Sequence, residues 1–126
     1  MQYLLLIYQA ELPAGAKPDP DEMAAEFAAY DVFTRETRDR GQFIAGEALG
    51  PTSTATSVRV QEGRTVVTDG PFAETKEALG GFYLLECKDL DEAIEMAAKI
   101  PAAKRGTIEV RPIWAYTSGA SVTGEG

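Results

Sequence analysis

Residues 3–8 read Tyr3-Leu4-Leu5-Leu6-Ile7-Tyr8, a run that is apolar on both of the faces between which strand side chains alternate. Residues 82–87 show the same pattern and read Phe82-Tyr83-Leu84-Leu85-Glu86-Cys87. A strand that is covered on both sides has this composition, whereas a strand with one wet face alternates apolar with polar side chains. The two runs therefore predict the central strands of a sheet.

Two helices accompany these strands in the sequence. Asp19 is expected to cap the first helix, with Pro20 at its first position and Gly41 as its C-terminal stop. Asp89 is expected to cap the second helix. Apolar residues at helical spacing predict the face that each helix buries. For the first helix these are Met23, Phe27, Tyr30 and Phe33, and for the second Leu90, Ile94 and Ala97.

The remaining segments complete an α+β fold. Residues 43–49 and 107–114 are predicted strands, and Pro112 places the latter at a sheet edge. Residues 56–60 and 64–68 predict a hairpin, with Gly63 supplying the positive φ of its turn. The resulting order is the ferredoxin-like βαββαβ plan with an inserted β-hairpin. Residues 115–126 are rich in Gly, Ser and Thr and predict a flexible C-terminal tail.

In this plan two helices cover only one face of the sheet. The other face still carries apolar side chains from residues 3–8 and 82–87. An apolar face of that size is expected to be covered, and the simplest cover is a second copy of the chain. The sequence therefore predicts a homodimer that forms a dimeric α/β-barrel.

Composition narrows the possible functions. The chain carries 12 Lys and Arg against 20 Asp and Glu, a formal net charge of −8, so no nucleic acid and no anionic membrane is expected as a partner. It has no histidine and one cysteine, Cys87, which is expected in the core. This composition excludes histidine-based catalysis and predicts neither a metal site nor a disulfide, and no cofactor is expected. The apolar N-terminus lacks a basic segment and a cleavage site, so we expect a cytoplasmic protein.

One segment carries more charge than a turn requires: Asp69-Gly70-Pro71-Phe72-Ala73-Glu74-Thr75-Lys76-Glu77. This nine-residue run resembles the signature of the DGPFAETKE branch of the YCII-related (DGPF domain) proteins. Residues 3–8, 46–49, 65–68, 80–83 and 109–112 also resemble pieces of that family. The resemblance covers residues 1–114, which form the predicted domain.

The resemblance implies a dimeric α/β-barrel of ferredoxin-like protomers, in agreement with the topology above. It also implies a cleft that has been taken as a sign of enzymatic activity. Some members occur beside, or fused to, extracytoplasmic-function sigma factors. A His-Asp pair proposed as catalytic in other members has no counterpart here, because the chain has no histidine.

Two carboxylates are candidate catalytic residues. Asp69 is either a general base or a cap of its own turn. Strand alternation places Glu47 on the same face as Phe43, Ala45 and Leu49. Glu47 is then either a carboxylate on an apolar surface, whose pKa burial would raise, or an edge residue that reaches water.

Further residues are candidates for substrate binding. Glu74 and Lys76 either point into a cleft or form a solvated surface pair. Arg111 either holds an anionic substrate, pairs with Glu47 or forms a plain ion pair. Tyr8 is a core aromatic whose hydroxyl reaches a partner at the sheet edge.

The sequence leaves two functions open. The first is a cofactor-independent enzyme or binder of a small molecule that uses a polar cleft at the dimer barrel. The second is a non-catalytic regulatory or ligand-binding module associated with sigma-factor signalling. Whether the protein is an enzyme is not decided by the sequence.

Overall fold

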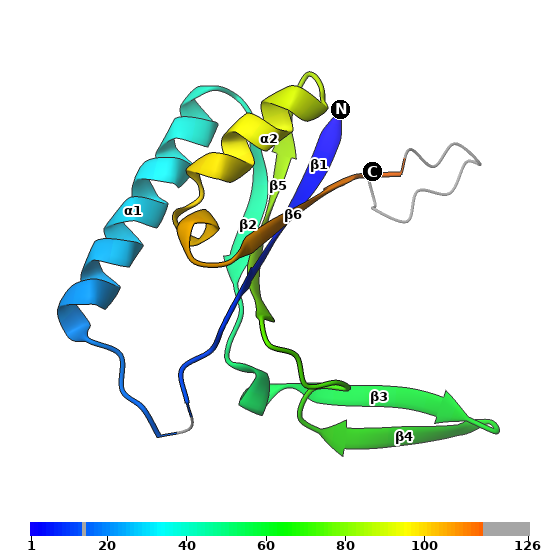
Figure 1. Cartoon of the computed structure of the whole chain (residues 1–126). Coiled ribbons are helices and arrows are strands. Elements are labelled where there is room, and N and C mark those ends of the chain that lie inside the picture. The colour runs from blue at the N-terminus through cyan, green and yellow to red at the C-terminus, as the bar shows by residue number, and fades with distance from the viewer. Residues whose placement is uncertain (14, 115–126) are drawn as a thin grey trace.

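The structure, a computed structural model, describes residues 1–13 and 15–114 and centres on a four-stranded sheet (Figure 1). The strands are β1 (Gln2–Gln9), β2 (Phe43–Ala48), β5 (Ala78–Glu86) and β6 (Thr107–Pro112). They follow the order β2-β5-β1-β6, and every neighbouring pair is antiparallel. The doubly apolar strands are central and β6 lies at an edge, as predicted. This arrangement is compatible with a ferredoxin-like α+β fold. The predicted tail, 115–126, lies outside the described residues.

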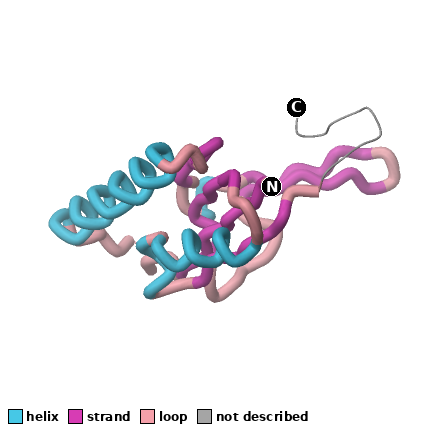
Figure 2. Tube along the Cα trace, turned by 90° about the horizontal axis from the view of Figure 1, so that it is seen from above, coloured by secondary structure: helices cyan, strands magenta, loops and turns pink. Residues whose placement is uncertain are grey.

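Helices α1 (Pro20–Asp39) and α2 (Leu90–Lys99) lie on the same face of this sheet (Figures 1 and 2). Both predicted caps are confirmed. The Asp19 carboxylate accepts from the backbone N–H of Asp21 at 2.9 Å, and the Asp89 carboxylate accepts from that of Glu92 at 2.9 Å. Short 3₁₀ turns lie at η1 (Thr52–Thr54) and η2 (Pro101–Lys104). No helix in the described ranges combines the length and apolarity of a membrane span.

The core fills the space between the helices and this face. Tyr3, Leu5 and Ile7 point into it from β1, and Tyr83 and Leu85 do so from β5. The helices and the segments next to them contribute Phe33, Cys87, Ala93, Met96, Ala97, Ile100 and Ala102. Cys87 is 1% exposed, which confirms its predicted place in the core.

The predicted apolar stripe of each helix is partly wrong. Met23 and Phe27 are 41% and 62% exposed, because α1 packs on the core through Phe33, in its second half. In α2, Leu90 and Ile94 are about half exposed. Small alanines allow close approach of a helix to a sheet, and α2 turns the side of Ala93, Met96 and Ala97 inward instead.

The face of the sheet opposite the helices is called here the open face. Its centre consists of the cross-strand pairs Leu4–Leu84 and Leu6–Phe82, together with Tyr8. These side chains are only half-buried, and no helix of the described chain covers them (Figure 1). The open face also carries Glu47 from β2 and Glu109 and Arg111 from β6.

Strands β3 (Thr56–Gln61) and β4 (Arg64–Asp69) form a separate two-stranded sheet that projects from the body of the protein (Figures 1 and 2). Their turn contains Gly63 at φ 77°, the positive φ that the sequence predicts. Val58 and Val67 face each other across the two strands, and both are 61% exposed. Asp69, at the end of β4, therefore lies outside the four-stranded sheet.

Candidate functional site

Three of the predicted site residues lie on the open face. Tyr8 lies on β1, Arg111 on the edge strand β6, and Glu47 on the opposite edge strand β2. The Arg111 Nε donates to Glu109 Oε2 at 2.5 Å, and this hydrogen bond raises the pKa of the guanidinium. Arg111 therefore forms a plain ion pair with Glu109, which was one of the alternatives predicted from the sequence.

The prediction that Glu47 shares a face with Phe43 is wrong. The register between β2 and β5 shifts between Phe43 and Ala45, so that one extra residue interrupts the alternation. Phe43 therefore packs against the core on the helix side, while Glu47 pairs with Phe82 on the open face. The Glu47 side chain is exposed, in agreement with the alternative prediction of an edge residue that reaches water.

The remaining predicted residues lie in or beyond the projecting hairpin. Asp69 ends β4, and Glu74 and Lys76 are exposed in the loop that follows. Among the described residues, no hydrogen bond or ion pair involves these three side chains. Asp69 and Glu47 belong to different sheets, so the protomer does not join them as a catalytic pair. Their catalytic roles, and substrate binding by Glu74 and Lys76, stay predictions.

The turn at Asp69 has a different stabiliser from the one predicted. The backbone N–H of Gly70 donates to the Ala55 oxygen at 2.7 Å, and the Ser57 hydroxyl donates to the Gly70 oxygen at 2.8 Å. These two bonds connect the two ends of the hairpin. The Asp69 carboxylate takes no part in them, so its predicted role as a turn cap is wrong.

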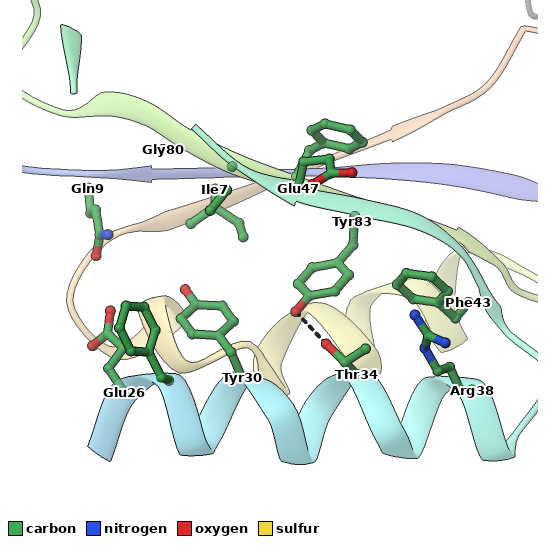
Figure 3. Close-up of a pocket in the computed structure, with 15 residues that line it drawn as sticks. Ile7, Gln9, Glu26, Tyr30, Thr34, Arg38, Phe43, Glu47, Gly80 and Tyr83 are labelled. Atoms are coloured by element: carbon green, nitrogen blue, oxygen red, sulfur yellow. Dashed lines mark hydrogen bonds between the residues drawn. The ribbon is translucent and has the colours of Figure 1, made fainter. Parts of the chain in front are cut away.

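A pocket that the sequence did not predict lies between α1 and the sheet, on the helix side (Figure 3). It has a volume of about 360 Å³ and is called here the α1 pocket. Strands β2 and β5 form one wall, to which Phe43, Gly46, Gly80 and Tyr83 belong. Helix α1 forms the other wall. Its first turns stand away from the sheet, which leaves room between the two walls (Figure 1).

Five residues of α1 line this pocket: Phe27, and a set of four spaced four positions apart, namely Glu26, Tyr30, Thr34 and Arg38. Positions four apart lie above one another on a helix, so the four side chains of this set form one row along the pocket. Figure 3 shows Glu26 at one end of the row and Arg38 at the other, with Tyr30 and Thr34 between them. The pocket is therefore polar along α1 and mainly apolar along the sheet.

Tyr83 connects the two walls. Its phenol oxygen lies 2.9 Å from the Thr34 hydroxyl, and its ring makes an edge contact with Phe33 at a centroid distance of 4.8 Å. Burial raises the pKa of Tyr83. Burial also raises the pKa of Tyr30, and the nearby Glu26 charge adds to this shift. Both phenols are therefore protonated at neutral pH and can donate hydrogen bonds.

The charged ends of the row differ in their partners. Glu26 forms an ion pair with Arg105. The Arg38 guanidinium lies over the Phe43 ring, 4.5 Å from its centroid, and forms no ion pair in the described part of the chain. The Glu26 charge is thus balanced within the protein, and that of Arg38 faces the pocket mouth with an aromatic ring as its neighbour.

A comparison with known protein families finds that the YCII-related domain matches residues 1–117. The chain belongs to the YCII-related family. A protein of Rhizobium meliloti (strain 1021), itself described as uncharacterised, is 37% identical to this YCII-related chain over 123 residues. The alignment covers 94% of the chain and 97% of that relative.

Glycines give the α1 pocket of this YCII-related protein its shape. A Cβ on Gly46 would lie 2.8 Å from the Tyr83 ring, so that ring needs a glycine beside it on β2. A Cβ on Gly80 would meet nothing closer than 3.9 Å, which leaves open space above β5. The Gly80-Gly81 pair within an otherwise apolar strand was the sequence signal for this opening. No group of three or more metal-ligating side chains occurs among the described residues.

Proposed function

We propose that this YCII-related protein is a small-molecule-binding homodimer in which each protomer holds its ligand in the α1 pocket. The observation that supports binding is the pocket itself, with a mainly apolar sheet wall and hydroxyl groups converging from α1 and β5. Its volume of about 360 Å³ lies at the small end of the roughly 300–1,000 Å³ typical of ligand sites. The occupant is thus a small organic molecule.

The open face supports the dimer. Leu4, Leu6, Phe82 and Leu84 form a continuous apolar surface at the centre of the sheet. Two such faces packed against each other would remove these side chains from water, at about 25 cal/mol per Å² of apolar surface. The product is a dimeric α/β-barrel, as the DGPFAETKE segment also implies through its resemblance to that branch of the family.

In this dimer the barrel interior would contain Tyr8, Glu47 and Arg111. A catalytic role in proton transfer requires a carboxylate within hydrogen-bond reach of the substrate. The α1 pocket offers hydroxyl donors. Of the two acidic residues that line it, Glu26 is paired with Arg105, and Glu47 directs its side chain away from α1 (Figure 3). We therefore favour ligand binding over proton-transfer catalysis, and over a sigma-factor module that would use a surface instead of a pocket.

Native mass spectrometry of protein purified from its own host tests the binding proposal. Wild-type protein is expected to retain a small molecule that denaturation releases. Gly80→Val would fill the open space above β5 and is expected to abolish retention, while Gly80→Ala adds one methyl group and keeps most of it. Equal retention by wild type and Gly80→Val would place the ligand elsewhere and contradict the proposal.

Light scattering tests the dimer. At micromolar concentration the expected mass is twice the protomer mass of 13.6 kDa. Leu6→Lys places a charge at the centre of the open face and is expected to give monomers. Ile94→Lys changes an exposed apolar residue of α2 and serves as the matched control. A monomeric wild type, or a Leu6→Lys variant that remains dimeric, would contradict the assembly.

A further inference from the structure

The row of side chains along α1 carries information about the charge of the ligand. Glu26 and Arg38 lie twelve residues apart on one helix, which is about 18 Å along its axis at ~1.5 Å per residue. Arg105 balances Glu26, so the acidic end of the pocket has no free negative charge for a cationic ligand. The basic end keeps its charge, since no carboxylate in the described residues pairs with Arg38.

The geometry of Arg38 suits an anion. One face of its guanidinium lies over the Phe43 ring, 4.5 Å from the centroid. This contact holds the planar group and leaves its N–H edges free, and such edges bind a carboxylate through two parallel hydrogen bonds. Arg38 is exposed, so an anion can reach it at the mouth of the pocket.

Among the described residues, the middle of the pocket offers no cation to a second negative charge on the ligand. Between Arg38 and Glu26 the α1 wall presents the hydroxyl of Thr34 and the phenol of Tyr30 (Figure 3). The sheet wall presents Ile7 and the Tyr83 ring. These groups accommodate an apolar or aromatic body with at most a few hydrogen-bonding atoms. At the far end Glu26 and Arg105 neutralise each other, so the described part of the chain has no unpaired cation available there for an additional anionic group.

We propose that the α1 pocket binds a small monocarboxylate with an apolar body, its carboxylate on Arg38 and its body directed between Tyr30 and Tyr83. This inference rests on the proposed function and specifies the chemical class of its ligand. It makes Arg38 the residue that selects the charge of the ligand, and Phe43 the residue that positions Arg38.

Calorimetric titration with matched acids and amides tests the charge selection. The probes are 3-phenylpropanoate and octanoate, with 3-phenylpropanamide and octanamide as their neutral counterparts. At least one carboxylate is expected to bind, and its amide to bind about tenfold more weakly or worse, because a hydrogen bond to a charged group contributes ~1.5–3 kcal/mol. Comparison of the aromatic with the aliphatic probe shows which kind of apolar group the pocket prefers.

Arginine variants locate the selection in the pocket. Arg38→Gln is expected to weaken carboxylate binding about tenfold while leaving amide binding unchanged. Arg38→Lys restores part of the loss, because an ammonium group cannot form the planar pair. Arg35→Gln removes an exposed arginine of the same helix that does not line the pocket, and it is the matched control. Circular dichroism establishes that all three variants are folded.

The outcomes separate the ligand class from the pocket. If an acid and its amide bind equally, and both lose binding in Gly80→Val, the carboxylate class is overturned while the pocket remains the site. Failure of both carboxylates to bind wild-type protein would overturn the class as well. Binding that persists unchanged in Gly80→Val would place the ligand outside the α1 pocket and contradict the proposed function itself.

Discussion

The hydroxyl of Thr34 on α1 and the phenol of Tyr83 on β5 lie 2.9 Å apart, and they join the two walls of the α1 pocket. Thr34 is half-buried and Tyr83 is 7% exposed, so water competes weakly for this hydrogen bond. The bond holds α1 beside the sheet at the middle of the pocket, where the helix begins to stand away. It thereby fixes the width of the pocket.

The Thr34–Tyr83 hydrogen bond is expected to contribute about 0.5–1.5 kcal/mol to the free energy of unfolding. A double-mutant cycle with Thr34→Val and Tyr83→Phe measures this coupling by urea denaturation. Tyr83→Phe keeps the ring and therefore its edge contact with Phe33. Strictly additive single-variant effects would show that the two hydroxyls do not interact.

Gly106, which directly precedes β6, is predicted to be the least replaceable glycine of the described residues. A Cβ at this position would collide with the backbone oxygen of Tyr8, at the point where β6 begins to pair with β1. Backbone cannot move as a flexible side chain can, so Gly106→Ala is expected to lower the free energy of unfolding by at least about 1–3 kcal/mol. Gly80→Ala, with open space around its Cβ, is the control. Equal midpoints of urea denaturation for the two variants would contradict this reading.

Much of the fold could be predicted from the sequence, because its strongest signals are local. A run such as residues 3–8, apolar on both faces, is typical of the middle of a sheet, and β1 lies there. Asp19 and Asp89 precede helices that begin where their caps require. Cys87 without a histidine partner behaves as a small core residue.

The site could not be predicted in the same way, because it depends on tertiary geometry. The rotation of α1 about its axis is set by the packing of Phe33. It turns Thr34 toward the sheet beside the predicted Tyr30, and it leaves Met23 exposed. A bulge in β2 separates Glu47 from Phe43, and strand alternation assumes that no bulge occurs. Both features shape the α1 pocket, and neither has a periodicity that a single sequence reveals.

The buried thiol of Cys87 is expected to make stability fall at alkaline pH. Burial raises the pKa of this thiol above its ordinary value of 9.0, and the charges of Glu92 and Glu86 add to the shift. Its contribution to stability is thus fully present below pH 9.0 and is lost as the pH rises through the higher pKa of the folded state. Between the pKa of the unfolded state and that of the folded state, the Cys87 thiol is deprotonated in the unfolded chain and still protonated in the folded chain.

Denaturation of wild type and Cys87→Ala at several pH values from about 8 to 10 checks this expectation. The alanine variant is less stable at every pH because it leaves a small cavity, but its stability is expected to depend less on pH. The phenols of Tyr30 and Tyr83, whose pKa values are also raised, act in the same direction at higher pH and are present in both proteins. Parallel pH profiles would show that the thiol is not the cause.

The turn at the start of the DGPFAETKE segment depends on Ser57 and not on Asp69. The Ser57 hydroxyl donates to the Gly70 oxygen at 2.8 Å, whereas the Asp69 carboxylate makes no hydrogen bond in the described part of the chain. Ser57→Ala is therefore expected to reduce the free energy of unfolding by about 0.5–1.5 kcal/mol, and Asp69→Asn to change it by less than about 0.5 kcal/mol. Urea denaturation of the two variants beside wild type makes the comparison. A larger loss in Asp69→Asn than in Ser57→Ala would return the role of turn cap to Asp69. A silent Asp69→Asn would leave that carboxylate free for the chemistry at the hairpin that the sequence first suggested.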